Sequence, residues 1–271
     1  MKTFIRWFGN KSRYLKYILP YIPKEYNTYI EPFVGSGALF LNLQPKKWII
    51  NDLNTDITTL WKIVQTSHIK MLNRIKLFEK KLELLSADEK KKYFSKITKK
   101  IPEMKFGFLR AMYFLLAKYH AYMGNINTNN KFAFPGLVKK RVHIFTQKYF
   151  NNINEINIYL NNSSGHIHNK DYSKILKLAK KNDFIFLDPP YYEKDKDYHF
   201  TYNKDQKITK SFNDELYNNL QILDKKGVKW MMTQADTNEI IQKFKKYKII
   251  KFQVYRISDN TYKNELIIMN Y

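Results

Sequence analysis

The stretch DFIFLDPPY, residues 183–191, joins a short apolar run to an abrupt polar ending. Four apolar residues, 184–187, bounded by turn-forming residues predict a buried β-strand. Proline cannot donate to a sheet ladder, so the strand must stop at Asp188, directly before Pro189. The motif that follows is therefore expected at the carboxyl end of a strand, where open α/β sheets bind their ligands.

This motif brings a carboxylate, two proline carbonyls and an aromatic ring close together. Asp188 and the Pro189 carbonyl can accept hydrogen bonds from an exocyclic amine, and Tyr191 can stack on a planar base. Asp188, Pro189, Pro190 and Tyr191 are therefore the candidate catalytic residues. Taken alone, the motif also fits an ordinary exit from a strand into a loop, so the rest of the chain is needed to choose between a binding site and a simple loop.

A second pattern lies upstream, in residues 28–52. The segment 28–33, TYIEPF, predicts a strand, and Gly35 and Gly37 then permit a tight turn into an apolar helix. A strand over 48–51 ends at Asp52, which lies 17 residues beyond Gly35. In nucleotide-binding units an acid meets the ribose hydroxyls after about 20 residues. The third glycine of the dinucleotide fingerprint is missing, which favours an adenosine ligand without a pyrophosphate over NAD.

The middle of the chain changes to apolar residues at helical spacing. We expect helices over 55–65, 68–85 and 106–123, and a further helix opened by the capping box of Ser86 and Glu89. His120 is expected to pack in the core rather than to bind a ligand, and no cluster has the spacing of a metal site. This part therefore predicts a helical insert without a metal.

The last hundred residues alternate strands and helices, which is typical of a mostly parallel sheet. A helix is expected over 173–182, and a second one should end at Gly227. The stretch 192–212 is polar and aromatic without a clear period, and we interpret it as a lid over the site. Residues 142–170 carry little signal.

Composition favours a polyanionic partner. Lys and Arg number 48 against 24 Asp and Glu, a formal charge of +24. Since 42 of the 48 are lysine and asparagine is also abundant, AT-rich coding is an alternative explanation of the excess. The absence of cysteine excludes disulfides and thiolate zinc sites. No long apolar run and no signal peptide are recognisable, so a cytoplasmic location is expected.

The loop 124–141, GNINTNNKFAFPGLVKKR, mixes asparagines, phenylalanines and a basic end. Asparagine, lysine and arginine read base edges and hold phosphates, so the loop is a candidate DNA-binding segment. An ordinary asparagine-rich surface loop remains the alternative. The candidate DNA-binding residues are Asn125, Asn127, Lys131, Phe132, Pro135, Lys139, Lys140 and Arg141.

Taken together, the chain resembles the Dam-like, D12-class DNA adenine-N6 methyltransferases of the alpha group. The matching stretches are WFGNK (7–11), EPFVGSG (31–37), NDLNTDITTLWKIV (51–64), DY (171–172), LDPPY (187–191), FTYN (200–203) with SF (211–212), and YRISDNTYKNEL (255–266). Their order fits as well, because the glycine motif comes first and a long insert separates it from LDPPY.

The resemblance implies an α/β protein with a Rossmann-like methyltransferase sheet, formed by residues 1–54 and 165–271. It implies that residues 55–164 are an inserted, mainly helical target-recognition domain. It also implies a catalytic role for the LDPPY motif on double-stranded DNA, with S-adenosylmethionine as cofactor. The cofactor-binding residues would be Trp7, Lys11, Phe33, Gly35, Gly37, Asp52, Asp171 and Tyr172.

Further expectations come from the family alone. Members carry an Asn-Gly-Leu-x-Arg-x-Asn stretch before the recognition hairpin, whereas this chain reads YMGNINTNNKF with Asn125 at the arginine position. A GATC-type target is expected from the family only. A cognate restriction nuclease is a candidate partner, and the enzyme would act as a monomer or weak dimer on DNA. It would work in bacterial cytoplasm, or in the DNA-containing compartment of a phage- or virus-infected cell.

In this reading the target adenine is flipped out of the duplex and its N6 is methylated by direct displacement. Two alternatives stay open. One is a methyltransferase that acts on RNA adenine or on a protein glutamine, since such enzymes share the Asp/Asn-Pro-Pro-Tyr motif. The other is a catalytically silent nucleic-acid-binding protein with the same fold.

Overall fold

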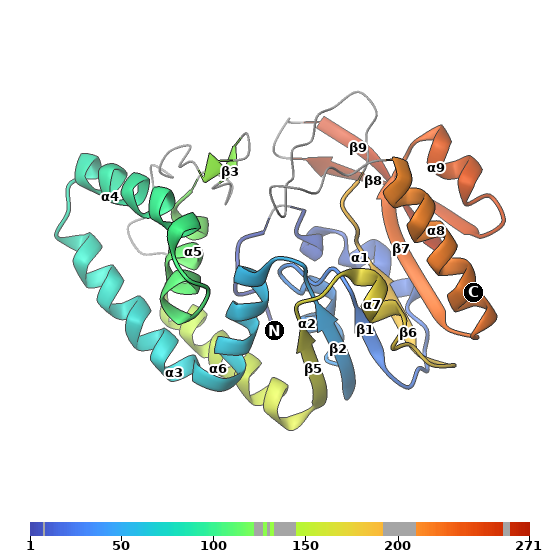
Figure 1. The fold of residues 1–271 in the computed structure, drawn as a ribbon, viewed down its shortest axis with the longest axis horizontal. Helices are drawn as coiled ribbons and strands as arrows, with labels where there is room; N and C mark the ends of the chain where they lie inside the picture. The colour runs from blue at the N-terminus through green and yellow to red at the C-terminus, as the bar shows by residue number, and fades with distance from the viewer. Residues whose placement is uncertain (8, 122–126, 129–130, 133–144, 192–209, 257–260) are drawn as a thin grey trace. The chain divides into compact units, whose positions relative to one another are not determined.

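The computed structural model describes residues 1–7, 9–121, 127–128, 131–132, 145–191, 210–256 and 261–271 (Figure 1). The chain forms two compact units, each assembled from three segments of the sequence. Unit 1 comprises Met1–Asn10, Gly35–Gln44 and Asn54–Ile167. Unit 2 comprises Lys11–Val34, Pro45–Leu53 and His168–Tyr271.

A seven-stranded sheet runs in the order β5-β2-β1-β6-β7-β9-β8. Strand β1 is parallel to β2 and β6, β6 is parallel to β7, and β9 is antiparallel to β7 and β8. This is the mostly parallel, Rossmann-like sheet that the alternation of strands and helices predicted. The bounds are β1 Tyr29–Glu31, β2 Lys47–Asn51, β5 Ser164–His168, β6 Phe184–Leu187, β7 Lys229–Ala235, β8 Lys248–Arg256 and β9 Thr261–Met269.

Strand β6 behaves as the apolar run predicted. All four of its residues are buried, and it ends at Leu187, immediately before Asp188. Its register places Leu187 opposite Met232 of β7, so Thr233 follows at the same edge of the sheet. The carboxyl end of β6 therefore meets the last residues of β7, where polar side chains can gather.

The helices of unit 2 pack apolar side chains on the sheet. Helices α7 (Tyr172–Leu176) and α8 (Lys210–Lys225) lie in front of β6 and β7 in Figure 1. One buried cluster includes Leu220 and Leu223 of α8 together with Trp230 of β7. Helix α7 ends at Leu176, so the expected helix over 173–182 is wrong at its carboxyl end. The other helices here are α1 (Leu15–Ile18) and α9 (Asn238–Lys243), with short 3-10 turns at Lys11–Arg13 and Leu19–Tyr21.

The described part of unit 1 is mainly helical. Its helices are α2 (Ala38–Leu43), α3 (Thr55–Glu83), α4 (Ala87–Lys100), α5 (Phe108–His120) and α6 (Gln147–Asn162), with a 3-10 turn at Ile101–Glu103. The two helices expected over 55–65 and 68–85 meet in α3 at Ser67, whose φ of −146° marks a kink. The capping box is confirmed, because the Ser86 amide donates to Glu89 Oε2 at 2.8 Å and the Glu89 amide donates to Ser86 Oγ.

Helix α6 and strand β5 fall in the segment that carried little signal. The buried residues of α6 are Phe150, Ile153, Ile156 and Leu160, which recur every three or four positions. This spacing is a helical signal, diluted by the asparagines between them. None of the helices that the structure describes is both long and apolar enough to cross a membrane.

Candidate active site

Asp188 is held by two partners in unit 2. Thr233 Oγ1 donates a hydrogen bond to Asp188 Oδ1 at 2.7 Å, and Lys11 Nζ lies 2.7 Å from the same oxygen. The Asp188 side chain is 20% exposed and that of Lys11 is 9% exposed. Because both interactions engage Oδ1, they fix the rotation of the carboxylate. The pairing also brings Lys11, expected from the family to hold the cofactor, directly against the candidate catalytic acid.

Tyr191 lies in the same cluster. Its hydroxyl donates to Glu265 Oε2 at 3.1 Å, and Lys11 Nζ lies 5.2 Å from the centre of its ring. Burial raises the pKa of Tyr191 well above its usual value, and the charges of Asp188 and Glu265 raise it further. The phenol therefore stays neutral at any physiological pH and offers an aromatic face beside a carboxylate. Neither Thr233 nor Glu265 was singled out from the sequence, because both lie on strands far along the chain.

Asp52 and its neighbour Asn51 occupy the carboxyl end of β2. Asp52 is only 4% exposed. The Asn51 amide donates to the carbonyls of Pro32 and Lys170, each at 2.9 Å, and its Oδ1 accepts from the Lys170 amide at 2.9 Å. Asn51 thus ties together the loops that follow β1 and β5. It is a positioning residue that sequence reasoning missed, and its only signal was a polar side chain at a buried strand end.

The remaining cofactor candidates of unit 2 form an aromatic pair and a helix cap. The rings of Phe33 and Tyr172 are stacked, with centres 5.3 Å apart and planes inclined by 30°. Asp171 Oδ1 accepts from the Ser173 amide at 2.9 Å and from its hydroxyl at 2.6 Å, which starts α7. These bonds hold the loop after β5 in place next to the aromatic pair.

Trp7 and Gly35 meet in unit 1. Gly35 and Gly37 have φ values of +46° and +66°, in the left-handed region that favours glycine. A Cβ atom on Gly35 would lie 2.8 Å from Cδ1 and Nε1 of Trp7, so only glycine fits there. On the other side, Trp61 Nε1 donates to the Gly35 carbonyl at 3.1 Å. The glycine turn is thus held between two indole rings.

These groups fit S-adenosylmethionine. The buried carboxylate at the end of β2 suits the two ribose hydroxyls, and the exposed part of the aromatic pair suits an adenine ring. In unit 1, the glycine turn allows a ligand to approach the backbone closely. Among the described residues, no three His, Asp or Glu side chains gather in the way that a metal ion needs.

Replacing Gly35 with alanine should weaken S-adenosylmethionine binding by about tenfold or more. The new Cβ must push Trp7 aside, and strained backbone costs on the order of 1–3 kcal/mol. Isothermal titration with the cofactor measures the change. Gly107→Ala is the matched control, because Gly107 has a φ of +150° with no atom within 4 Å of the added Cβ. Equal cofactor affinities for the two variants would contradict the expected role of the Gly35 turn.

The DNA-binding candidates are described only in part. Asn127 lies in β3 (Asn127–Thr128), while Lys131 and Phe132 form β4 (Lys131–Phe132). The two strands pair antiparallel, which confirms a hairpin at this point. Asn125, Pro135, Lys139, Lys140 and Arg141 lie outside the described residues. So do residues 192–209 of the lid expected over 192–212, whereas its last three residues begin α8 and are helical.

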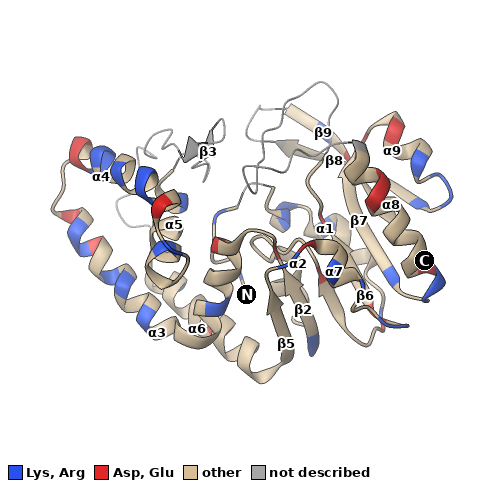
Figure 2. Ribbon diagram, viewed as in Figure 1, with Lys and Arg blue, Asp and Glu red and all other residues tan. Residues whose placement is uncertain are grey.

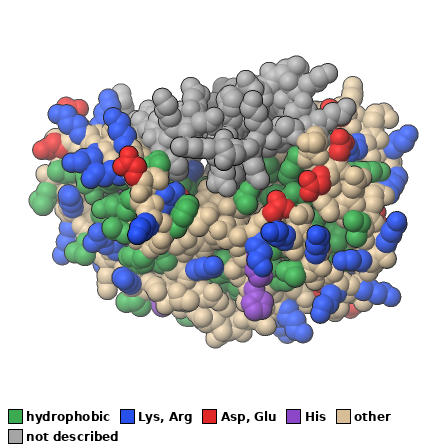
Figure 3. Space-filling view, viewed as in Figure 1, with side chains coloured by type: hydrophobic (Ala, Val, Ile, Leu, Met, Phe, Trp, Pro, Cys, Tyr) green, Lys and Arg blue, Asp and Glu red, His purple; other side chains and the backbone are tan. Residues whose placement is uncertain are grey.

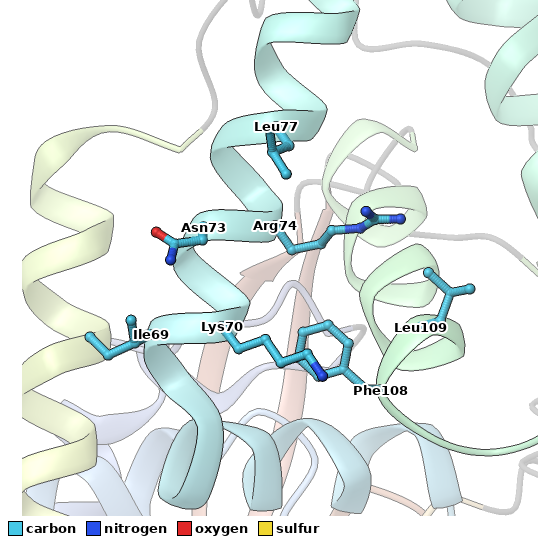
Figure 4. Close-up of a pocket in the computed structure, with 7 residues that line it drawn as sticks. All are labelled: Ile69, Lys70, Asn73, Arg74, Leu77, Phe108 and Leu109. Carbon is cyan, nitrogen blue, oxygen red and sulfur yellow. The ribbon is translucent and has the colours of Figure 1, made fainter.

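The helices of unit 1 carry a basic surface. Lysine and arginine residues follow α3 and α4 in Figure 2, and in Figure 3 apolar side chains are interspersed with them over these helices. Lys91, Lys92, Lys96 and Lys99 line one face of α4. A hollow between α3 and α5 is lined by Ile69, Lys70, Asn73, Arg74, Leu77, Phe108 and Leu109 (Figure 4). The charge suits a phosphate backbone.

Lys118 of α5 is a buried ammonium in unit 1. The residue is 8% exposed, and Nζ lies 4.5 Å from the centre of the Trp7 ring and 5.5 Å from that of Phe114. Burial lowers the pKa of Lys118 from 10.5 to about 8. The charged form therefore opposes folding at neutral pH, and this cost disappears as the pH rises from about 8 towards 10.5.

We expect Lys118→Met to stabilise the protein at pH 7. The lowered pKa corresponds to about 3 kcal/mol as an upper estimate, part of which the lost cation–π contacts offset. Urea denaturation of wild type and variant at pH 7 and pH 10 tests this, and most of the gain should be lost at pH 10. Lys99→Met, on the exposed face of α4, serves as the control without such a pH dependence. A stability gain of equal size at both pH values would be inconsistent with a buried, uncompensated ammonium.

The seven-stranded, mostly parallel sheet is that of a Rossmann-like methyltransferase. The family model of the D12 class N6 adenine-specific DNA methyltransferase matches residues 7–257, and the chain belongs to this family. It is therefore an enzyme that transfers a methyl group from S-adenosylmethionine to N6 of adenine in DNA. The fold, cofactor and reaction implied by the sequence motifs are thereby confirmed.

Three relatives of this chain, from two bacteria and a virus, illustrate the similarity. The Type II methyltransferase M1.LlaDCHI of Lactococcus lactis subsp. cremoris is 27% identical over 100% of this chain and 96% of its own length. The DNA adenine methylase of Haemophilus influenzae is 27% identical over 74% of this chain and 67% of its own length. The Type II methyltransferase M.CviBI of Paramecium bursaria Chlorella virus NC1A is 24% identical over the full length of both chains.

Proposed function

We propose that the LDPPY motif holds an adenine turned out of double-stranded DNA, and that the helical insert selects the sequence in which this adenine lies. The observation that supports the catalytic role is the double attachment of Asp188 Oδ1 to Thr233 and Lys11 at the end of β6. A carboxylate fixed in this way keeps Oδ2 pointing in one direction. We assign Oδ2 as the acceptor of a hydrogen bond from N6, with the Pro189 carbonyl accepting the second N6 proton.

The residues act by positioning. S-adenosylmethionine supplies a methyl group activated by its positively charged sulfur. Tyr191 stacks on the base, while Asp188 and Pro189 turn the N6 lone pair towards the methyl carbon. In the displacement the N–C bond would form as the methyl–sulfur bond breaks and the cofactor leaves as its neutral thioether, and the carboxylate of Asp188 would stabilise the positive charge that N6 gains. One N6 proton then leaves to water, and no covalent enzyme intermediate is needed.

The insert is the candidate target-recognition domain. Residues 55–164 include the basic face of α4 and the hairpin that carries Asn127 and Lys131. Phosphate contacts from such lysines would position the duplex, and the hairpin would read base edges. We propose a GATC-type site as the first target to test. A restriction nuclease is the proposed companion, since three full-length relatives are named Type II methyltransferases. We place the enzyme, as a monomer or weak dimer, in the compartment that holds the DNA.

Methyl-labelled S-adenosylmethionine tests these proposals directly. Purified protein is incubated with unmethylated duplex DNA, and the digested nucleosides are separated. Label in N6-methyl-2′-deoxyadenosine is the expected result, and sequencing of the modified sites then gives the target. Methylation at sites other than GATC would refute that target while leaving the reaction intact. Label only in RNA or protein would contradict the assignment to DNA, and bound cofactor without any transfer would indicate a silent binding protein.

A further inference from the structure

We propose that Glu265 is a positioning residue for methyl transfer, because its carboxylate bridges Tyr191 of the LDPPY motif to Tyr14 and so fixes the ring on which the adenine stacks. The inference rests on the stacking role of Tyr191 proposed above. Glu265 lies on β9, opposite Ala235 of β7 and Phe252 of β8, and is 2% exposed.

The bridge uses both carboxylate oxygens. Tyr191 donates to Oε2 at 3.1 Å, and Tyr14 donates to Oε1 at 3.0 Å. A tyrosine ring turns about only two side-chain bonds, and its hydroxyl oxygen lies on the axis of the second one. Holding that oxygen therefore fixes the position and the long axis of the ring, and leaves only rotation about that axis. Burying a carboxylate is costly unless hydrogen bonds compensate for the lost water. Two phenol donors provide that compensation here, and burial raises the pKa of Tyr191, so that this phenol keeps its proton.

The same bridge sets the surroundings of the catalytic acid. Lys11 Nζ lies 5.0 Å from the centre of the Tyr14 ring and 5.2 Å from that of the Tyr191 ring. This ammonium is paired with Asp188 at 2.7 Å. Glu265 therefore holds the rings of Tyr14 and Tyr191, which flank Lys11. Because Lys11 is paired with Asp188, the bridge also sets where the Asp188 carboxylate lies relative to the face of Tyr191 on which the adenine stacks.

The consequence is a stacking surface that is ordered before the base arrives. Without the bridge, the Tyr191 ring would have to be immobilised when the adenine enters, which costs affinity and misplaces N6. We expect Glu265→Met, which keeps the volume and removes the acceptor, to lower kcat by about tenfold. Glu265→Gln keeps an acceptor for one tyrosine and should retain more activity. Binding of S-adenosylmethionine should change less than twofold in either variant.

A double-mutant cycle separates positioning from general loss of structure. Tyr191→Phe removes the same hydrogen bond from the other side, so it should lower kcat about as much as Glu265→Met. The double variant should then be no slower than either single one. Tyr14→Phe is the matched control, because it removes the second hydrogen bond of the bridge without altering Tyr191. It should produce a smaller loss.

Base capture provides the second readout. With 2-aminopurine in place of the target adenine, flipping is monitored by the change in fluorescence when the protein binds the duplex. Both Glu265→Met and Tyr191→Phe should decrease the amplitude of this fluorescence change. The proposal would be overturned if the loss of kcat in the double variant equalled the product of the two single losses. A loss of cofactor affinity as large as the loss of kcat would overturn it as well. If Glu265→Met fails to fold, Tyr191→Phe with normal kcat and normal base capture overturns it as well. Wild-type protein without N6-methyladenine product would instead refute the function itself.

Discussion

Asp188→Ala should lower kcat on the order of 10³-fold, while the affinity for S-adenosylmethionine remains close to that of the wild type. The variant loses the acceptor for N6 and the negative charge that stabilises the developing cation, and such groups contribute about 10²–10³ in rate. It also leaves Lys11, whose side chain is 9% exposed, without the carboxylate it pairs with. Single-turnover methylation of a defined duplex, together with cofactor titration, measures both quantities.

Two further variants show which property of Asp188 matters. Asp188→Asn keeps the shape and removes the charge, so it should remain far below wild-type activity. Thr233→Val removes the hydrogen bond to Oδ1, and a charge-assisted bond of about 1.5–3 kcal/mol predicts roughly a tenfold to hundredfold loss. Near-normal turnover of Asp188→Ala would show that the base is held by other groups and that the mechanism is wrong.

Arg110→Met should destabilise unit 1 by about 3–5 kcal/mol, the usual cost of leaving a buried charge unpaired. Arg110 Nε and Nη2 donate to Asp56 Oδ1 and Oδ2 at 2.8 and 3.0 Å. Arg110 is 7% exposed and Asp56 is 4% exposed. A third nitrogen, Nη1, donates to the carbonyls of Ile101 and Met104 at 2.6 and 3.0 Å. The guanidinium thus links the starts of α3 and α5 to the turn after α4, and urea denaturation measures its contribution.

The matching control is a pair at the surface. Lys251 pairs with Asp236, but its side chain is 56% exposed, so Lys251→Met should cost less than about 1 kcal/mol. Combining Arg110→Met with Asp56→Asn removes the unpaired charge and should restore part of the stability. If Arg110→Met and Lys251→Met lowered the free energy of unfolding by the same amount, burial of the pair between Arg110 and Asp56 would make no difference to its contribution to stability.

Local patterns predicted most elements correctly. The apolar run 184–187, the Gly35 turn and the capping box at Ser86 each depend on residues that are close in sequence, and the structure has all three. Helix α6 was missed because asparagines dilute its apolar spacing. The helix after Asp171 ends at Leu176, earlier than the apolar spacing predicted.

The sequence by itself determined most of the order of strands and helices, the strand end at Asp188 and the family to which the motifs belong. Only the tertiary structure decided which atoms meet there. Thr233 is 45 residues from Asp188, and Glu265 is 74 residues from Tyr191. Turns and periodicities are set by neighbouring residues, whereas these contacts depend on the register of β7 and β9. That register results from the packing of whole strands, and no short stretch of sequence encodes it.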